Sequence, residues 1–217
     1  MMNLMTYSAM AAFLCVSTTC TLASAFQVAS PISISRSHMK SPSQSLTALQ
    51  DATTDVEELL QTSYPMFYNL IISKNADVWK VITSPSTDPD VPSGFTIFAP
   101  NDEAMNKLGK KKLDQLLDDR NRETAEKIAS FHAVAEPVGA WDLITSGGIV
   151  TVGGVVDVGK SKVGGFFGFG GEEDGGVTVS GAKILETKMV ESCVVHEMDG
   201  LISPDILWRY MDQLRIL

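Results

Sequence analysis

Apolar residues follow a helical spacing through the first part of the region that is expected to fold. Between Leu59 and Ile82 they recur about every three or four positions, which predicts two helices, the second ending before Pro85. Residues 84–94 contain three prolines and are predicted to form a loop. Helical spacing returns over residues 110–134, so most of this stretch is predicted to be helical as well.

A short strand is predicted between these helical regions, at residues 95–100. Its sequence, FTIFAP, has the aromatic and β-branched residues that favour a strand, and Pro100 is expected to end it because proline has no backbone N–H to donate. Asn101 is predicted to cap a helix that runs through Leu108, with the acidic Asp102 near its positive end. The strand therefore leads directly into a helix at this corner.

After Pro137 the spacing changes from helical to alternating, which is typical of strands. Three strands are predicted, at residues 149–158, 177–185 and 190–198. Asp199 and Gly200 are expected to form a turn in which glycine permits a positive φ, and Pro204 is expected to stop the last strand. Helices come first and strands mainly last, an order that predicts an α+β fold.

The N-terminal residues have the composition of a removable leader. Residues 1–25 carry no charge, and their apolar run is long enough for a signal peptide but too short to span a membrane. Small residues end this stretch, so cleavage is predicted after Ala25, which would make Phe26 the new N-terminus. Residues 26–54 are rich in serine, as in a transit peptide or a disordered segment, and the folded domain is expected to span residues 55–217.

Charge and cysteine content restrict the class of protein. The net charge of −9 would repel phosphate backbones, so nucleic acid is not an expected partner. Cys193 is the only cysteine outside the leader, so the mature chain has no internal disulfide, which favours an intracellular destination. No further apolar segment is long enough for a transmembrane helix in the mature chain.

No catalytic, cofactor or metal site can be assembled from the sequence. His132 and His196 are the only histidines outside the presequence and are expected to be core residues, too few for a zinc site. Residues 154–161 match the phosphate-loop pattern, but the glycines that follow disfavour the helix that such a loop requires. The chain is therefore predicted not to be an enzyme.

Three motifs resemble the signatures of the fasciclin domain. Residues 96–105 (TIFAPNDEAM) resemble its first signature, residues 131–134 (FHAV) stand where the family has a central Tyr-His pair, and residues 194–204 (VVHEMDGLISP) are similar to its closing signature. The resemblance covers about residues 63–208 and implies a single fasciclin-like domain, a β-wedge of antiparallel strands with N-terminal and central helices. The motif positions to which we assign structural roles are Pro100, Asn101, Asp102, His132, His196, Asp199, Gly200 and Pro204.

The sequence departs from the family pattern in the region that has been tied to cell adhesion. Many members have an Asp-Ile pair and then an Asn-Gly turn before the closing strand, where this chain has Thr187-Lys188 and Ser192-Cys193. Phe131 also replaces the tyrosine of the central pair and so lacks its hydroxyl donor. Adhesion through these positions is therefore not expected.

The segment 159–176 is the most individual part of the sequence, with 8 glycines and an acidic run beside three phenylalanines, Phe166, Phe167 and Phe169. Exposed apolar rings are unfavourable in water unless something covers them. Two interpretations stay open. The rings fold back onto the domain, or they form a docking loop for a protein complex, a membrane surface or a pigment.

Three functions are consistent with these observations. The first is a non-enzymatic interaction module, an accessory or scaffolding protein of an algal plastid, because the string ASAF at residues 23–26 resembles the bipartite presequence of algae with plastids inside the secretory system. Its expected place is the stroma or the stromal thylakoid surface, with a thylakoid or photosynthetic complex as candidate partner. The alternatives are a secreted or cell-surface adhesion protein and a carrier of a small apolar ligand such as a carotenoid.

Overall fold

The computed structural model describes residues 42–74, 76–84, 92–163 and 172–214. The presequence residues Ala25 and Phe26 lie outside these ranges, as do Phe166, Phe167 and Phe169. No described helix is long and apolar enough to cross a membrane.

The N-terminal part of the domain is a series of helical segments. They are α1 (Pro42–Ser63), α2 (Pro65–Phe67), the π-helix η1 (Tyr68–Ile72) and α3 (Ala76–Thr83). The two helices expected from the spacing are thus divided further, because Pro65 disfavours helical geometry at the residue before it and a π turn follows.

Helix α1 begins well before Asp55, where the sequence had predicted the start of the folded domain. Its inward face carries Leu49, Ala52, Val56 and Leu60, all buried, at the spacing of one helical stripe. The segment before Asp55 is weakly apolar and rich in serine, so its composition did not indicate that it forms part of a buried helix. The folded domain therefore includes part of the segment that resembles a transit peptide.

In the part of the chain that the structure describes, seven strands form one sheet in the order β2-β1-β7-β6-β5-β4-β3. Their bounds are β1 (Thr96–Pro100), β2 (Ala133–Val134), β3 (Gly148–Thr151), β4 (Gly154–Val163), β5 (Glu172–Val179), β6 (Ala182–Val190) and β7 (Cys193–Met198). The α+β fold class is confirmed. Neighbouring strands are antiparallel with one exception, since β1 and β7 pair in parallel.

Each of the three strands predicted after Pro137 contains a two-residue turn. The turns fall at residues 152–153, 180–181 and 191–192. Ser180 and Gly181 both have positive φ, 51° and 84°, as a tight hairpin turn of this length requires. A turn of two residues leaves the alternation of apolar and polar positions in phase, so the spacing alone did not reveal these hairpins.

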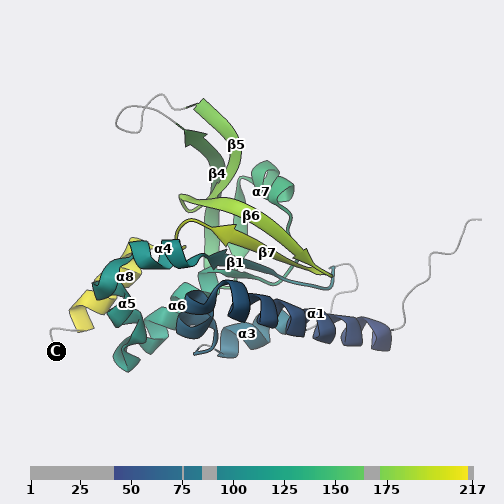
Figure 1. Ribbon diagram of the computed structural model, residues 1–217, viewed down its shortest axis with the longest axis horizontal. Helices are drawn as coiled ribbons and strands as arrows, with labels where there is room; N and C mark the ends of the chain where they lie inside the picture. Colours follow the sequence, from purple (N-terminus) through teal and green to yellow (C-terminus); the bar gives the residue numbers. More distant parts are fainter. Residues whose placement is uncertain (1–41, 75, 85–91, 164–171, 215–217) are drawn as a thin grey trace, which may run out of the picture. The chain divides into compact units, whose positions relative to one another are not determined.

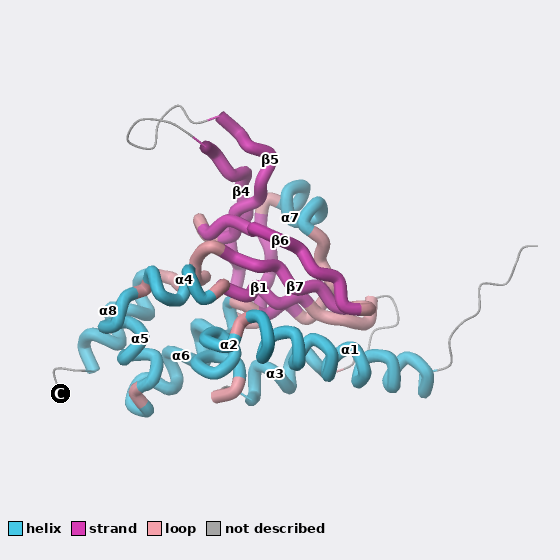
Figure 2. The backbone as a smooth tube through the Cα atoms, in the orientation of Figure 1, coloured by secondary structure: helices cyan, strands magenta, loops and turns pink. Residues whose placement is uncertain are grey.

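The remaining helices cover the sheet and extend from it. They are α4 (Asp102–Lys107), α5 (Gly109–Leu117), the 3-10 helix η2 (Asp119–Asn121), α6 (Arg122–Phe131), α7 (Ala140–Ser146) and α8 (Asp205–Leu214). The short helices α7 and α8 were not predicted from the sequence. In Figures 1 and 2 helices α1, α3 and α6 lie together on one side of β1 and β7, while α7 contacts β3, β4 and β5.

Two apolar clusters make up the core. The larger joins the helical layer to one face of β1 and β7, and includes Phe67, Ile97, Ile128 and Val195. The smaller lies around Phe98, between the strands of the β3–β6 region and α7. The chain thus buries both faces of the central strands β1 and β7, which are the strands that carry two of the sequence signatures.

Removing the first part of α1 is expected to destabilise the domain. A chain that begins at Asp55 lacks Leu49 and Ala52, which are 6% and 0% exposed, so the free energy of unfolding should fall by roughly 2–4 kcal/mol. Chemical denaturation of this chain and of one beginning at Lys40 measures the effect. The longer chain keeps all of α1, and equal stability of the two would contradict the role of residues 42–54.

Candidate functional site

The corner between β1 and α4 is held by Asn101. Its Oδ1 accepts a hydrogen bond from the backbone N–H of Ala104 at 2.9 Å, so the N-cap predicted from the sequence is confirmed. Its Nδ2 donates to Oε1 of Glu197 on β7 at 3.1 Å. Pro100 is the last residue of β1 and is aligned with Met198, and Asp102 begins α4. The corner therefore also attaches α4 to the neighbouring strand.

Glu197 is the centre of a part-buried group of polar side chains that we call the polar seam, formed by Tyr64, Asn101, Lys188 and Glu197. The Tyr64 hydroxyl donates to Oε2 of Glu197 at 3.0 Å and accepts from Nζ of Lys188 at 3.0 Å. Burial raises the pKa of Tyr64, which is 1% exposed, and the Tyr64 hydrogen bond raises the pKa of Lys188. The seam connects the end of α1 to β6, β7 and the start of α4.

The positions where many fasciclin domains carry adhesion residues are used internally in this chain. Lys188 belongs to the polar seam, and the Thr187 hydroxyl donates to Nδ1 of His196 at 2.9 Å. Cys193 is completely buried, and this burial raises the pKa of its thiol. All three side chains therefore make contacts within the domain.

Both described histidines are buried and use both ring nitrogens for structural hydrogen bonds. His132 donates from Nδ1 to the carbonyl of Ile128 at 2.8 Å and accepts at Nε2 from the N–H of Ile202 at 2.9 Å. His196 donates from Nε2 to the carbonyl of Val138 at 2.9 Å and stacks on Phe98. Burial lowers the pKa of His196 and lowers that of His132 to about 4.

The turn after β7 differs in detail from the expectation. Asp199 accepts at Oδ1 from the N–H of Lys183 at 2.6 Å and so fixes the turn to β6. Gly200 does not have the positive φ expected of it; its lack of a side chain instead allows close approach to Ala182, whose Cβ would lie 3.1 Å from an added Cβ. Pro204 does not end β7, which stops at Met198, but immediately precedes α8.

No catalytic or metal-binding arrangement is found among the described residues. They contain no group of three or more His, Cys, Asp or Glu side chains that could hold a metal ion. Residues 154–161, which match the phosphate-loop pattern, lie within β4 and pair with β3 and β5. Their extended backbone is not the strand-to-helix turn that cradles phosphate.

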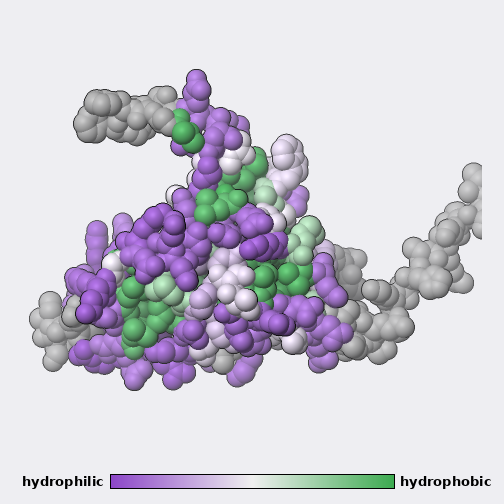
Figure 3. All heavy atoms as spheres, viewed as in Figure 1, coloured by the Kyte–Doolittle hydropathy of each residue, from purple (hydrophilic) through white to green (hydrophobic). Residues whose placement is uncertain are grey.

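A surface groove that the sequence did not predict runs beside α5, and we call it the α5 groove. Its volume is about 590 Å³, and its apolar lining includes Met66 and Leu70 from α2 and η1 and Leu113 and Leu117 from α5. Leu117 is 46% exposed, whereas its neighbour Leu116 is 2% exposed. Figure 3 shows apolar surface in the region of α5.

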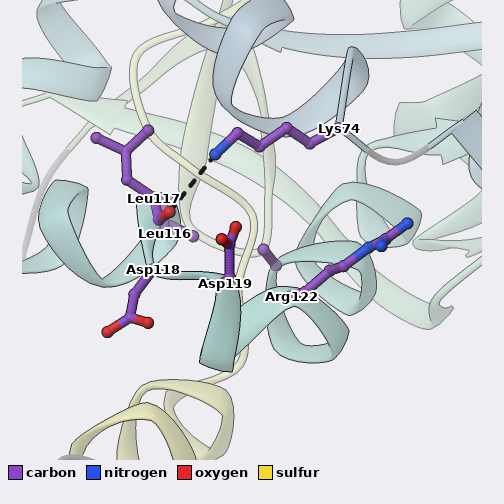
Figure 4. Close-up of a pocket in the computed structure, with 7 residues that line it drawn as sticks. Lys74, Leu116, Leu117, Asp118, Asp119 and Arg122 are labelled. Atoms are coloured by element: carbon purple, nitrogen blue, oxygen red, sulfur yellow. Dashed lines mark hydrogen bonds between the residues drawn. The ribbon is translucent and has the colours of Figure 1, made fainter.

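A smaller pocket of about 260 Å³ shares Leu117 with the α5 groove. In Figure 4 the Lys74 ammonium points to the carbonyl of Leu117, at 3.5 Å, while Asp119 and Arg122 lie across the pocket from it. The groove and the pocket together place apolar and charged groups along the whole of α5.

Comparison with protein-family models decides the family. The fasciclin domain model matches residues 63–204, which include all three sequence signatures. The chain belongs to the fasciclin domain family. Comparison with the curated proteins found no match. Among solved structures, a fasciclin domain pair from the insect cell adhesion molecule fasciclin I is similar, with 18% identity, a TM-score of 0.43, and coverage of 63% of this chain and 43% of that one. The chain thus spans less than half of that structure.

Family membership supports a non-enzymatic role in interaction. Helix α1 and helix α8 lie almost wholly outside the matched residues 63–204. The fasciclin domain of this chain therefore has its N-terminal and C-terminal helices beyond the region that the family model recognises.

Replacing Glu197 should destabilise the domain through the polar seam. In Glu197→Ala the Asn101 amide and the Tyr64 hydroxyl lose their acceptor, so the free energy of unfolding should fall by about 2–3 kcal/mol. Glu186→Ala is the matched control, since this carboxylate is 59% exposed and its ion pair with Lys188 should contribute less than about 1 kcal/mol. Equal losses in urea denaturation would contradict a special role of the seam.

Stability should fall as the pH is lowered from 6.5 to 4. The unfolded chain protonates His132 near pH 6.5 and the folded domain only near pH 4, so the unfolded state binds more protons within this window. The difference corresponds to about 3 kcal/mol, fully lost only below pH 4. Denaturation across this range measures it, and His132→Asn, which does not titrate, should show a smaller loss over the window than the unchanged protein.

Proposed function

We propose that this fasciclin domain is a non-enzymatic interaction protein that serves as an accessory or scaffolding component of an algal plastid. The observation that carries the interaction role is the contrast between two surfaces. At the family's adhesion positions the Thr187 hydroxyl, the Lys188 ammonium and the buried Cys193 side chain make contacts within the domain, and Ser192 is half-buried, whereas Leu117 and its neighbours in the α5 groove remain partly exposed. Partner binding is therefore assigned to a different surface.

The plastid destination rests on the composition of the leader. Residues 1–25 are uncharged and end in Ala-Ser-Ala before Phe26, and residues 26–50 are basic and rich in serine without Asp or Glu. Because α1 begins at Pro42 and contributes Leu49 to the core, a second cleavage that spares the folded domain falls before Pro42. The stroma or the stromal thylakoid surface is the proposed place of action.

The alternative is an adhesion protein that is secreted or held at the cell surface, since fasciclin domains include those of an insect cell adhesion molecule. Under this alternative the leader is a signal peptide followed by a flexible spacer. The two functions predict different destinations for a protein that carries this leader, the plastid for the first and the outside of the cell for the alternative.

A fluorescent fusion of residues 1–41 tests the destination without interrupting α1. The fusion is expected to enter the plastid of an alga whose plastid lies within the secretory system, and the same fusion with Phe26→Ala is expected to accumulate outside it. Microscopy and assay of the medium measure both. Secretion of the unmutated fusion would overturn the plastid proposal and support the adhesion alternative.

A further inference from the structure

We propose that the α5 groove binds an amphipathic helix of a partner protein, with apolar side chains on one face and carboxylates positioned over Lys107 and Lys110. This inference rests on the proposed interaction function and names the class of partner. The partner is identified by its chemistry, an apolar stripe with acidic residues beside it.

The floor of the groove has the form that accepts a helix. Met66 and Leu70 are four residues apart on one side, and Leu113 and Leu117 are four residues apart on the other. Leu113 and Leu117 therefore lie along one face of α5, and Met66 and Leu70 add apolar side chains from α2 and η1. From Lys110 to Leu117 the groove follows α5 for about 10 Å, or two helical turns, which matches an apolar stripe of the i, i+3, i+4, i+7 type.

The charges of α5 oppose its own helix dipole. Lys110, Lys111 and Lys112 occupy its positive first turn, where there is no acidic residue, and its last turn has no basic residue. A charge of this sign at the positive end of a helix is unfavourable. Sequences that oppose a local preference in this way do so most often where function requires it.

Only some of these lysines are used within the domain. Lys111 pairs with Asp212 at 2.8 Å and Lys112 lies over the Trp208 ring at 4.7 Å, so both hold α8 against α5. Lys110 lines the groove, Lys107 is exposed at the end of α4, three residues before Lys110, and neither has an ion pair among the described residues. In a chain of net charge −9, Lys107 and the three lysines of α5 gather four cations between the end of α4 and the first turn of α5, while Asp114 is the acidic residue that lines the groove.

The surroundings of the groove disfavour other occupants. Only helical segments line it, and their backbone groups are bonded within the helices, so an added β-strand finds no partners there. Its charged groups are spread along the rim, with Lys110 and Asp114 one turn apart, and do not converge on one point as they do around a small ligand. Asn69 and Asn106 add amide groups that can hydrogen-bond polar side chains of a helix.

The π turn of η1 forms part of one wall. The N–H of Ser73 bonds to the carbonyl of Tyr68 at 2.7 Å, which places an extra residue in the turn that contains Asn69 and Leu70. Such turns are rare and occur mainly at functional sites. Leu70 remains only partly buried in this turn, which leaves it accessible from the groove.

Two synthetic peptides of roughly 18 residues, long enough to form a helix, test the proposal with the full chain. Both carry leucines at i, i+3, i+4 and i+7; one has glutamates beside the leucines and the other has lysines. The acidic peptide is expected to bind about tenfold more tightly by fluorescence anisotropy, since two close charge pairs are formed or opposed. Lys107→Glu with Lys110→Glu should reverse the preference, and Leu117→Asp should weaken both peptides about tenfold.

Lys162→Glu on β4 reverses one charge away from the groove, so it is the matched control for Lys110→Glu alone and should leave the preference unchanged. The proposal is overturned if neither peptide binds, if both bind equally, or if Leu117→Asp has no effect while the protein stays folded by circular dichroism. Cross-linking in plastids separates this failure from that of the interaction function. If the groove variants are cross-linked to the same partners as the unchanged protein, the role of the groove is contradicted but the interaction function is not. If the unchanged protein is cross-linked to no partner, the interaction function itself is contradicted.

Discussion

The carboxylate of Glu197 is the point on which the arrangement of helices and sheet depends. It accepts from Tyr64 at the end of α1 and from Asn101 at the start of α4, and Lys188 on β6 lies 3.7 Å away. Helices α1 and α4 and the hairpin of β6 and β7 thus meet at one side chain of β7. Because the seam is part-buried, removal of its acceptor leaves donors without partners, which is far more costly than loss of an exposed ion pair. The same contacts keep Lys188 and Tyr64 from serving as surface groups.

Local chemistry made much of the fold predictable. The strand at residues 96–100 and the helix capped by Asn101 follow from a proline, a capping side chain and a few β-branched residues, all of which act over short distances. The hairpins were not predicted because their two-residue turns preserve the alternation of apolar and polar residues along the strands. The predicted domain began at Asp55 and so missed the first part of α1. The burial of Leu49 and Ala52 follows from packing against the core and cannot be inferred from the composition of the segment.

The candidate site was much less predictable than the fold. The burial of His132 and His196 could be expected from their place in apolar segments, but their partners Ile202 and Val138 are distant in sequence and emerge only from the sheet order. The α5 groove was not anticipated because the spacing of Leu113, Leu116 and Leu117 shows which residues share a face, and not whether another element covers that face. The three lysines at the start of α5 were the available signal, since they oppose the helix dipole.

The parallel pairing of β1 and β7 has a consequence for the order of events during synthesis. Thr96 lies beside Val194, so the centre of the sheet joins an early part of the folded region to one near the C-terminus. Loop closure over such a distance must precede most of the favourable contacts, which makes it slow. A chain still emerging from the ribosome therefore has no strand available to complete its central layer. Until β7 has been made, β1 has a strand, β2, on one edge alone.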